Sequence, residues 1–389
     1  MIISITIYSG IGISFSKTNE KYLIKFMIFM ILIVFFTILT IRILGNFKLR
    51  KYNDKFDKFC KNNEKFFNIV SFLFICTLLI HLFIPVIRIN QLWSPPSPTL
   101  INIFERSEIA SSGFILSLSD LLNIFLQPFF FIYLFILKEK NKKIKLALYL
   151  FFWIYLQYLK IGYMGRNDMI IFFIFILLLY GYDLKKYIKI KKKQIFVIII
   201  GLVLAIPFLI WYESFRLGVN NQLISIGRSL EELFFKECDY PKYYEFINQS
   251  ISPIKYILWI IFLPIPSLIF PGKPTIEINT IFSEFILGIS RKSAGYYVLL
   301  PSLMGESFMI FGNDFFWIHA ILLGVIIGFI FSYVNRYRYL TFFSLFYSIY
   351  ILTIGRGGSQ GYIGILINSC IPILLLNSII CKKNTYRRK

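Results

Sequence analysis

Apolar runs of about 18–22 residues recur along this sequence and constrain its fold more than any other feature. Each run is long enough to cross roughly 30 Å of hydrocarbon as a helix. Strands of a β-barrel would alternate apolar and polar residues, and these runs do not. Since hydrophobic residues make up 57% of the 389 positions, the runs predict an all-α polytopic integral membrane protein with about 10–12 transmembrane helices.

The predicted spans follow from the ends of the apolar runs, and residues 1–389 are expected to form a single membrane-embedded domain. Residues 1–16 are either a short first span or an interfacial segment. The other predicted spans are Ile24–Leu44, Phe66–Ile87, Leu116–Leu137, Leu146–Tyr163, Met169–Asp183, Ile195–Tyr212, Phe316–Val334, Phe342–Ile354 and Tyr362–Ile380.

The formal charge of +22 is concentrated in short stretches between or after the apolar runs. Those stretches are 45–65, 138–145, 185–193, the pair Arg336 and Arg338, and the tail 382–389. Short basic loops near helix ends mark the cytoplasmic side of a membrane, whereas a nucleic-acid surface would gather its charges on one folded face. The pattern predicts a multi-pass membrane protein with both termini in the cytoplasm and no nucleic-acid partner.

This topology places residues 213–315 outside the cytoplasm as one large periplasmic loop region. The region has eight basic and ten acidic residues, so it is close to neutral while the cytoplasmic loops are strongly basic. Tyr256–Phe270 and Ile281–Ile289 are apolar and aromatic, which argues against disorder. Tyr256–Phe270 is short and interrupted by prolines, so it is expected to be a re-entrant or interfacial helix, although two true spans would fit the same topology.

Four arginines are predicted on the outer side, where the positive-inside rule expects few cations. They are Arg166, Arg216, Arg291 and Arg356, and glycines flank the first and the last of them. A guanidinium group suits bidentate phosphate binding, so a shared phosphate or pyrophosphate ligand is predicted. The alternative is that each arginine pairs with a nearby acid or with lipid headgroups. Lys273, in a Pro/Gly-rich turn, is either a further anion ligand or a snorkelling interfacial lysine.

Two acids are predicted near the outer membrane boundary. Glu306 and Glu213 could each accept a proton from a sugar hydroxyl, because a partly desolvated carboxylate gains basicity. The alternative is a structural salt bridge to one of the arginines. The salt bridge is favoured for Glu213, while both alternatives stay open for Glu306.

Other residue types argue for metal-independent chemistry. His81 and His319 fall in or beside predicted spans, where ordinary helix packing is expected, and no metal-ligand spacing, P-loop or GxGxxG motif occurs, so no metal and no cofactor are predicted. The five cysteines form no CxxC pair and imply no disulfide framework. Gly324 and Gly328 form a GxxxG pair that predicts close helix packing.

The order of motifs from about residue 160 to the C-terminus resembles that of the O-antigen or oligosaccharide repeat-unit polymerases of the Wzy type. The motifs are Gly165-Arg166, Arg216, Phe-Pro-Gly-Lys-Pro at 270–274, Met-Gly-Glu-Ser-Phe-Met-Ile-Phe-Gly at 304–312 and Gly-Arg-Gly-Gly at 355–358. Before residue 160 only the hydropathy is similar.

The resemblance implies a membrane glycosyltransferase of a bacterial cytoplasmic (inner) membrane, which builds O-antigen or capsular polysaccharide from repeat units linked to undecaprenyl pyrophosphate. It implies Arg166, Arg216, Lys273, Arg291 and Arg356 as substrate-binding residues, with Arg216, Arg291 and Glu306 in catalysis. A chain-length regulator and a flippase would be its protein partners. Two alternatives remain. One is an O-antigen ligase, a family that looks to use a histidine in the large outer loop, where this sequence has none. The other is a lipid-linked oligosaccharide flippase.

Overall fold

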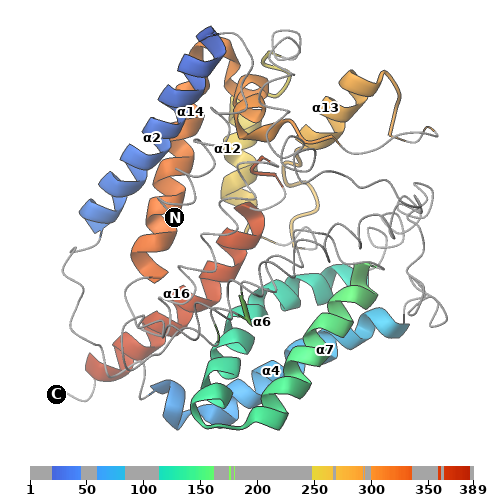
Figure 1. Cartoon of the computed structure of the whole chain (residues 1–389), viewed down its shortest axis with the longest axis vertical. Coiled ribbons are helices and arrows are strands. Elements are labelled where there is room, and N and C mark those ends of the chain that lie inside the picture. The colour runs from blue at the N-terminus through green and yellow to red at the C-terminus, as the bar shows by residue number, and fades with distance from the viewer. Residues whose placement is uncertain are drawn as a thin grey trace, which may run out of the picture. The chain divides into compact units, whose positions relative to one another are not determined.

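In a computed structural model of the chain, every described secondary-structure element is an α-helix (Figure 1). The structure describes residues 20–44, 59–83, 114–161, 175–176, 179, 248–265, 269–291, 293, 299–334, 358–360 and 363–385. The helices are α2 (Glu20–Leu44), α4 (Glu64–Phe83), α6 (Phe114–Glu139), α7 (Lys143–Ile161), α12 (Pro253–Phe262), α13 (Ile278–Leu287), α14 (Ser302–Val334) and α16 (Ile363–Thr385). The predicted spans at 1–16, 195–212 and 342–354, and nearly all of 169–183, lie outside the described residues.

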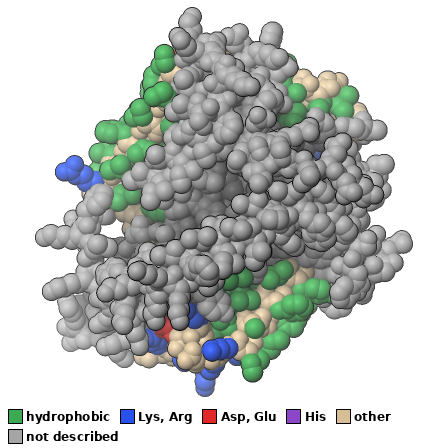
Figure 2. All heavy atoms as spheres, in the orientation of Figure 1, with side chains coloured by type: hydrophobic (Ala, Val, Ile, Leu, Met, Phe, Trp, Pro, Cys, Tyr) green, Lys and Arg blue, Asp and Glu red, His purple; other side chains and the backbone are tan. Residues whose placement is uncertain are grey.

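Three of the described helical segments are long and apolar enough to cross a membrane: Ile24–Leu44, Leu118–Glu139 and Ser302–Val334. They also carry large apolar side chains on their surfaces, such as Ile31 and Phe35 on α2, which are 63% and 56% exposed. Figure 2 shows such hydrophobic side chains along the visible flank of α2. A surface of this kind is unfavourable in water and suited to lipid. The chain is therefore an α-helical membrane protein.

Two compact units make up the chain: Met1–Tyr52 with Ser225–Cys370, and Asn53–Ile224 with Ile371–Lys389. In the first unit α2 and α14 pack together over their length. A Cβ atom on Gly324 would lie 2.9 Å from the Ile33 carbonyl oxygen, and one on Gly328 would lie 2.8 Å from the Thr37 carbonyl oxygen. The backbones thus approach as closely as glycine allows, and the close packing predicted for the GxxxG pair is confirmed.

α2 and α14 run in the same direction. Near their N-terminal ends, Lys25 Nζ donates a 2.5 Å hydrogen bond to Asn313 Oδ1, and the Phe29 and Phe316 rings are 6.4 Å apart. Further along, Gly328 lies against Thr40. The predicted topology requires this parallel arrangement, because it has both helices enter the membrane from the outer side.

In the second unit, α4, α6 and α7 form a group in which α6 runs antiparallel to both neighbours. Phe74 of α4 stacks on Phe130 of α6 with ring centroids 4.7 Å apart, and Ser119 donates a hydrogen bond to the Thr77 carbonyl oxygen. Phe131 of α6 meets Trp153 of α7 edge to face at 5.5 Å. These buried aromatic contacts give the three helices most of their shared interior.

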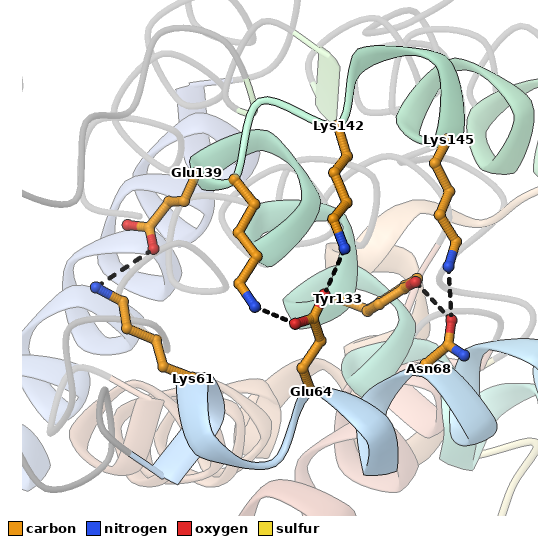
Figure 3. Close-up of polar contacts among 8 residues, drawn as sticks. Lys61, Glu64, Asn68, Tyr133, Glu139, Lys142 and Lys145 are labelled. Carbon is orange, nitrogen blue, oxygen red and sulfur yellow. Dashed lines mark hydrogen bonds and ion pairs between the residues drawn. The ribbon is translucent and has the colours of Figure 1, made fainter.

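Basic residues and acids meet at one end of this group, at the start of α4 and the turn between α6 and α7 (Figure 3). Glu64 forms ion pairs with Lys140 and with Lys142, the latter at 3.3 Å. Figure 3 shows Lys61 paired with Glu139 beside them, at 3.8 Å. The described part of the basic segment 45–65, residues 59–65, therefore meets the segment 138–145 at one end of the group, as the predicted topology requires.

Glu64 predicts a modest pH dependence of stability. Hydrogen bonding from Lys140 holds the pKa of Glu64 below its ordinary value. A carboxyl whose pKa falls on folding stabilises the fold above its unfolded pKa, and this stability is lost as the pH falls through its folded pKa. We expect Glu64→Gln to lower the free energy of unfolding by about 0.5 kcal/mol at neutral pH. Thermal unfolding in detergent should show that the difference in stability between the wild type and Glu64→Gln disappears as the pH is lowered from about 5 to about 3.

Glu277→Gln is the matched control for this prediction, because Glu277 is exposed and makes no ion pair with a described residue. If the loss of stability in Glu64→Gln became larger on acidification, ionised Glu64 would not be the group that stabilises the fold.

The region 213–315, predicted as one large loop region, contains α12, α13 and the first part of α14. α12 and α13 each begin three residues before one of the two apolar segments of this region, Tyr256–Phe270 and Ile281–Ile289, and overlap it. α14 begins at Ser302, whereas the sequence predicted a span from Phe316. Hydropathy places the start of this span too late, because the polar residues Glu306, Asn313 and Asp314 precede Phe316. Ser302–Gly312 is nevertheless buried within the protein throughout.

Candidate functional site

A chain of hydrogen-bonded polar side chains is buried in the first unit, and we call it the buried polar chain. Its members are Tyr256 of α12, Glu306, Ser307 and His319 of α14, and Ser359. Each of the five has 0% of its surface exposed. Polar groups at such depth are stable only when they are hydrogen-bonded, so the contacts among them fix the local structure.

α14 folds back on itself at Gly312, which brings two of these residues together. In a straight helix, Ser307 and His319 would be separated by roughly 18 Å along the axis. Instead, Ser307 Oγ lies 2.6 Å from His319 Nδ1. Gly312 has φ 79° and ψ 175°, a backbone conformation outside the helical region and open mainly to glycine. The segment Ser302–Phe311 thus returns alongside the helix that follows it, as a re-entrant helix would.

Residues 248–251 hold the end of this returned segment. The backbone N–H of Gln249 donates to the Phe308 carbonyl oxygen at 3.1 Å, and that of Ile251 donates to the Met309 carbonyl oxygen at 3.0 Å. Asn248 Oδ1 accepts a 2.9 Å hydrogen bond from the backbone N–H of Asn313. Two carbonyl groups before the break at Gly312 and one N–H group after it thereby find partners outside α14.

Glu306 holds the short loop Gly358–Gln360. One carboxyl oxygen accepts a hydrogen bond from the backbone N–H of Ser359, and the other contacts the Ser359 hydroxyl. Gly358 has φ 78°, which a residue with a side chain rarely adopts. On its other side the loop is tied down by Gln360, whose amide accepts from Asn279 N–H at 3.0 Å and donates to the Ile276 carbonyl oxygen at 2.7 Å.

Tyr256 joins the loop to His319. Its hydroxyl lies 2.6 Å from Ser359 Oγ and 2.8 Å from His319 Nε2. The His319 ring also packs against Phe311, with ring centroids 5.8 Å apart, and against Phe29 of α2 at 6.2 Å. The sequence predicted only helix packing for His319. The aromatic contacts agree with that, but both of its ring nitrogens also belong to the buried polar chain.

The structure describes three of the predicted site residues. Glu306 is at the centre of the buried polar chain. Arg291 is exposed, its backbone N–H donates to Glu284 Oε1 at 2.8 Å, and its guanidinium forms no ion pair with a described residue. Lys273 donates from Nζ to the Ile265 carbonyl oxygen at 2.9 Å, and partial burial lowers its pKa. No described contact links Arg291 or Lys273 to Glu306.

Arg166, Arg216 and Arg356 lie outside the described residues, as does Glu213. Convergence of the arginines on one anion site therefore stays a prediction. Among the described residues, no group of three His, Cys, Asp or Glu side chains could hold a metal ion. The prediction of metal independence is not tested by this.

Sequence reasoning missed Tyr256, Ser307 and Ser359 as members of the site. One signal was available, because a carboxyl within an apolar stretch needs hydrogen-bond partners. It could not identify those partners, since Ser359 is 53 residues from Glu306 in the sequence and Tyr256 is 103 residues from Ser359.

The chain has no match among the family models, among the curated proteins or among the solved structures with which it was compared. Its motifs and its geometry are therefore the basis for a functional assignment.

Proposed function

We propose that this protein polymerises oligosaccharide repeat units linked to undecaprenyl pyrophosphate, at the outer face of a bacterial inner membrane. One observation carries the proposal. The segments 304–312 and 355–358 resemble motifs of the repeat-unit polymerases, and Glu306 of the first binds Ser359, which directly follows Gly358 at the end of the second. The fold-back at Gly312 lies within the first motif. Motifs distant in sequence that meet in one buried site support a shared functional role.

The proposed membrane arrangement has about 10–12 spans, a large periplasmic region at 213–315 and both termini in the cytoplasm. Within each unit, the helix directions support it. α2 and α14 run parallel, as two helices that both lead inward must. α4 and α6 run antiparallel, and residues 59–65 meet the segment 138–145 at the end that the proposed topology assigns to the cytoplasm.

In the proposed reaction, a sugar hydroxyl oxygen of one lipid-linked unit forms a bond to the anomeric carbon of the growing chain. The bond from that carbon to the pyrophosphate oxygen breaks, and undecaprenyl pyrophosphate leaves with the electron pair. Arg166, Arg216, Arg291 and Arg356, assisted by Lys273, would stabilise the negative charge that develops on the leaving group. The hydroxyl proton passes to a phosphate oxygen of the leaving group, although the sequence predicted Glu306 as its acceptor. The complete burial of Glu306 and its two contacts with Ser359 favour a positioning role instead.

Alanine substitution of each arginine tests the proposal. We expect Arg166→Ala, Arg216→Ala, Arg291→Ala and Arg356→Ala each to lower the yield of long polysaccharide about tenfold, because each removes a charged hydrogen bond to the pyrophosphate. Yield would be measured with purified protein in lipid vesicles supplied with lipid-linked repeat units. Arg42→Ala is the control, since Arg42 is an exposed residue in the last turn of α2, at the predicted cytoplasmic end.

The products also separate the proposed function from its alternatives. A ligase would transfer the glycan to an added lipid acceptor without lengthening it. A flippase would move single repeat units across the vesicle membrane and leave their length unchanged. Either result with the wild-type protein would replace the polymerase assignment.

A further inference from the structure

The contacts within the buried polar chain determine how many hydrogen-bonding protons its side chains must carry. Five contacts connect its members in a row, from the Leu303 carbonyl oxygen through Ser307, His319, Tyr256 and Ser359 to Glu306. Each contact needs one proton between its two heavy atoms to be a hydrogen bond rather than a repulsion between lone pairs.

Neutral side chains with an ionised Glu306 supply too few protons. Ser307, Tyr256 and Ser359 each carry one hydroxyl proton, and a neutral His319 carries one on its ring, which gives four protons for five contacts. A fifth proton must sit on Glu306 or on His319. If it sat on His319, a carboxylate and an imidazolium would be separated by two hydroxyl groups in a fully buried site. Such charge separation is costly in an apolar interior.

A protonated Glu306 supplies a proton for each of these five contacts. Its hydroxyl donates to Ser359 Oγ, Ser359 donates to the Tyr256 oxygen, and Tyr256 donates to His319 Nε2. His319 then donates from Nδ1 to Ser307, and Ser307 donates to the Leu303 carbonyl oxygen. The other oxygen of Glu306 still accepts from the Ser359 backbone N–H. This arrangement also fixes His319 as the Nδ1-protonated tautomer.

We propose that Glu306 is protonated in the resting protein, and that Tyr256 and His319 act through it as positioning residues for the loop that follows Arg356. The proposal rests on the proposed function, in which Arg356 binds the lipid pyrophosphate. An ionised Glu306 would put a negative charge beside Ser359, three residues after Arg356 in the sequence. A neutral Glu306 holds the loop by hydrogen bonds and leaves the positive charge of Arg356 to the diphosphate ligand.

Two substitutions of Glu306 test the proposal. Glutamine has the shape of a protonated glutamic acid, so its amide can donate to Ser359 Oγ while its oxygen accepts from Ser359 N–H. Alanine can do neither. We expect E306A to lower polymer yield at least tenfold and E306Q to restore it to within about threefold of wild type, at equal protein abundance. If E306Q loses as much activity as E306A, Glu306 acts as an ionisable base and the positioning role is overturned.

Infrared spectroscopy reads the protonation state directly and does not depend on activity. The difference spectrum between wild type and E306Q should contain the C=O stretch of a protonated carboxylic acid. The stretches of a carboxylate in its place would overturn the neutral assignment.

Tyr256→Phe tests the middle of the chain, since it keeps the ring and removes the hydroxyl that joins Ser359 to His319. We expect it to raise the KM for the lipid-linked substrate severalfold with little change in kcat, because the loop is misplaced but the reacting groups remain. An unchanged KM would show that Tyr256 does not position the loop. Failure of the wild-type protein to make polymer would overturn the proposed function, while the infrared spectrum would still decide the protonation state of Glu306.

Discussion

Gly358→Ala is expected to lower polymer yield about a hundredfold while leaving the protein membrane-inserted. Gly358 has φ 78°, where an alanine is strained by about 1–2 kcal/mol. An added Cβ would also collide with Oε2 of Glu306 and lie 3.7 Å from the Ser302 carbonyl oxygen. Displacement of a buried carboxyl from its partners costs about 1–3 kcal/mol more. The sum is enough to shift the loop out of its position in most molecules.

Gly288→Ala is a matched control for this substitution. Gly288 has φ 66°, close to that of Gly358, but an added Cβ there would have no neighbour within 4 Å. It should therefore show the cost of backbone strain alone, about 1 kcal/mol in the free energy of unfolding, with little effect on polymer yield. Equal polymer yields from the two variants would mean that the contact between Glu306 and Gly358 is not needed for function.

The helices of this protein could be predicted largely from its apolar runs. The predicted spans Ile24–Leu44 and Leu116–Leu137 correspond to α2 and α6 within a few residues. The reason is physical, because the hydrocarbon thickness sets the length of a span and the backbone must be helical within it. The close packing at Gly324 and Gly328 was predictable for a similar reason, since only small residues let two helices approach so closely.

The buried polar chain could not be predicted in the same way. Hydropathy is a local measure, so it began the predicted span at Phe316 and assigned Ser302–Phe311 to the outer loop region. Within that segment, Glu306 finds its partner at Ser359 and Ser307 finds its partner at His319 on the rest of α14. Those partners are distant in the sequence. A polar residue in an apolar stretch indicates that partners exist, and tertiary structure decides which they are.

The second large effect is expected at the interface of α2 and α14, where Gly328→Leu should lower the free energy of unfolding by about 3 kcal/mol. An added Cβ on Gly328 would lie 2.7 Å from Thr40 Cβ and 2.8 Å from the Thr37 carbonyl oxygen. The second of these atoms belongs to the backbone and cannot rotate away, so α2 must move as a whole. Unfolding of the purified protein by titration with a denaturing detergent would measure the loss.

Val325→Leu separates this packing effect from a general effect of leucine in α14. Val325 lies on the same helix but is 42% exposed, so a larger side chain there meets lipid rather than α2, and we expect no change in stability. Gly328→Leu should also reduce polymer yield, because Phe29 of α2 packs against His319 of the buried polar chain. If both variants unfold at the same detergent concentration, then α2 does not depend on Gly328 for its close approach to α14, and the parallel pairing of these helices would lose its main support.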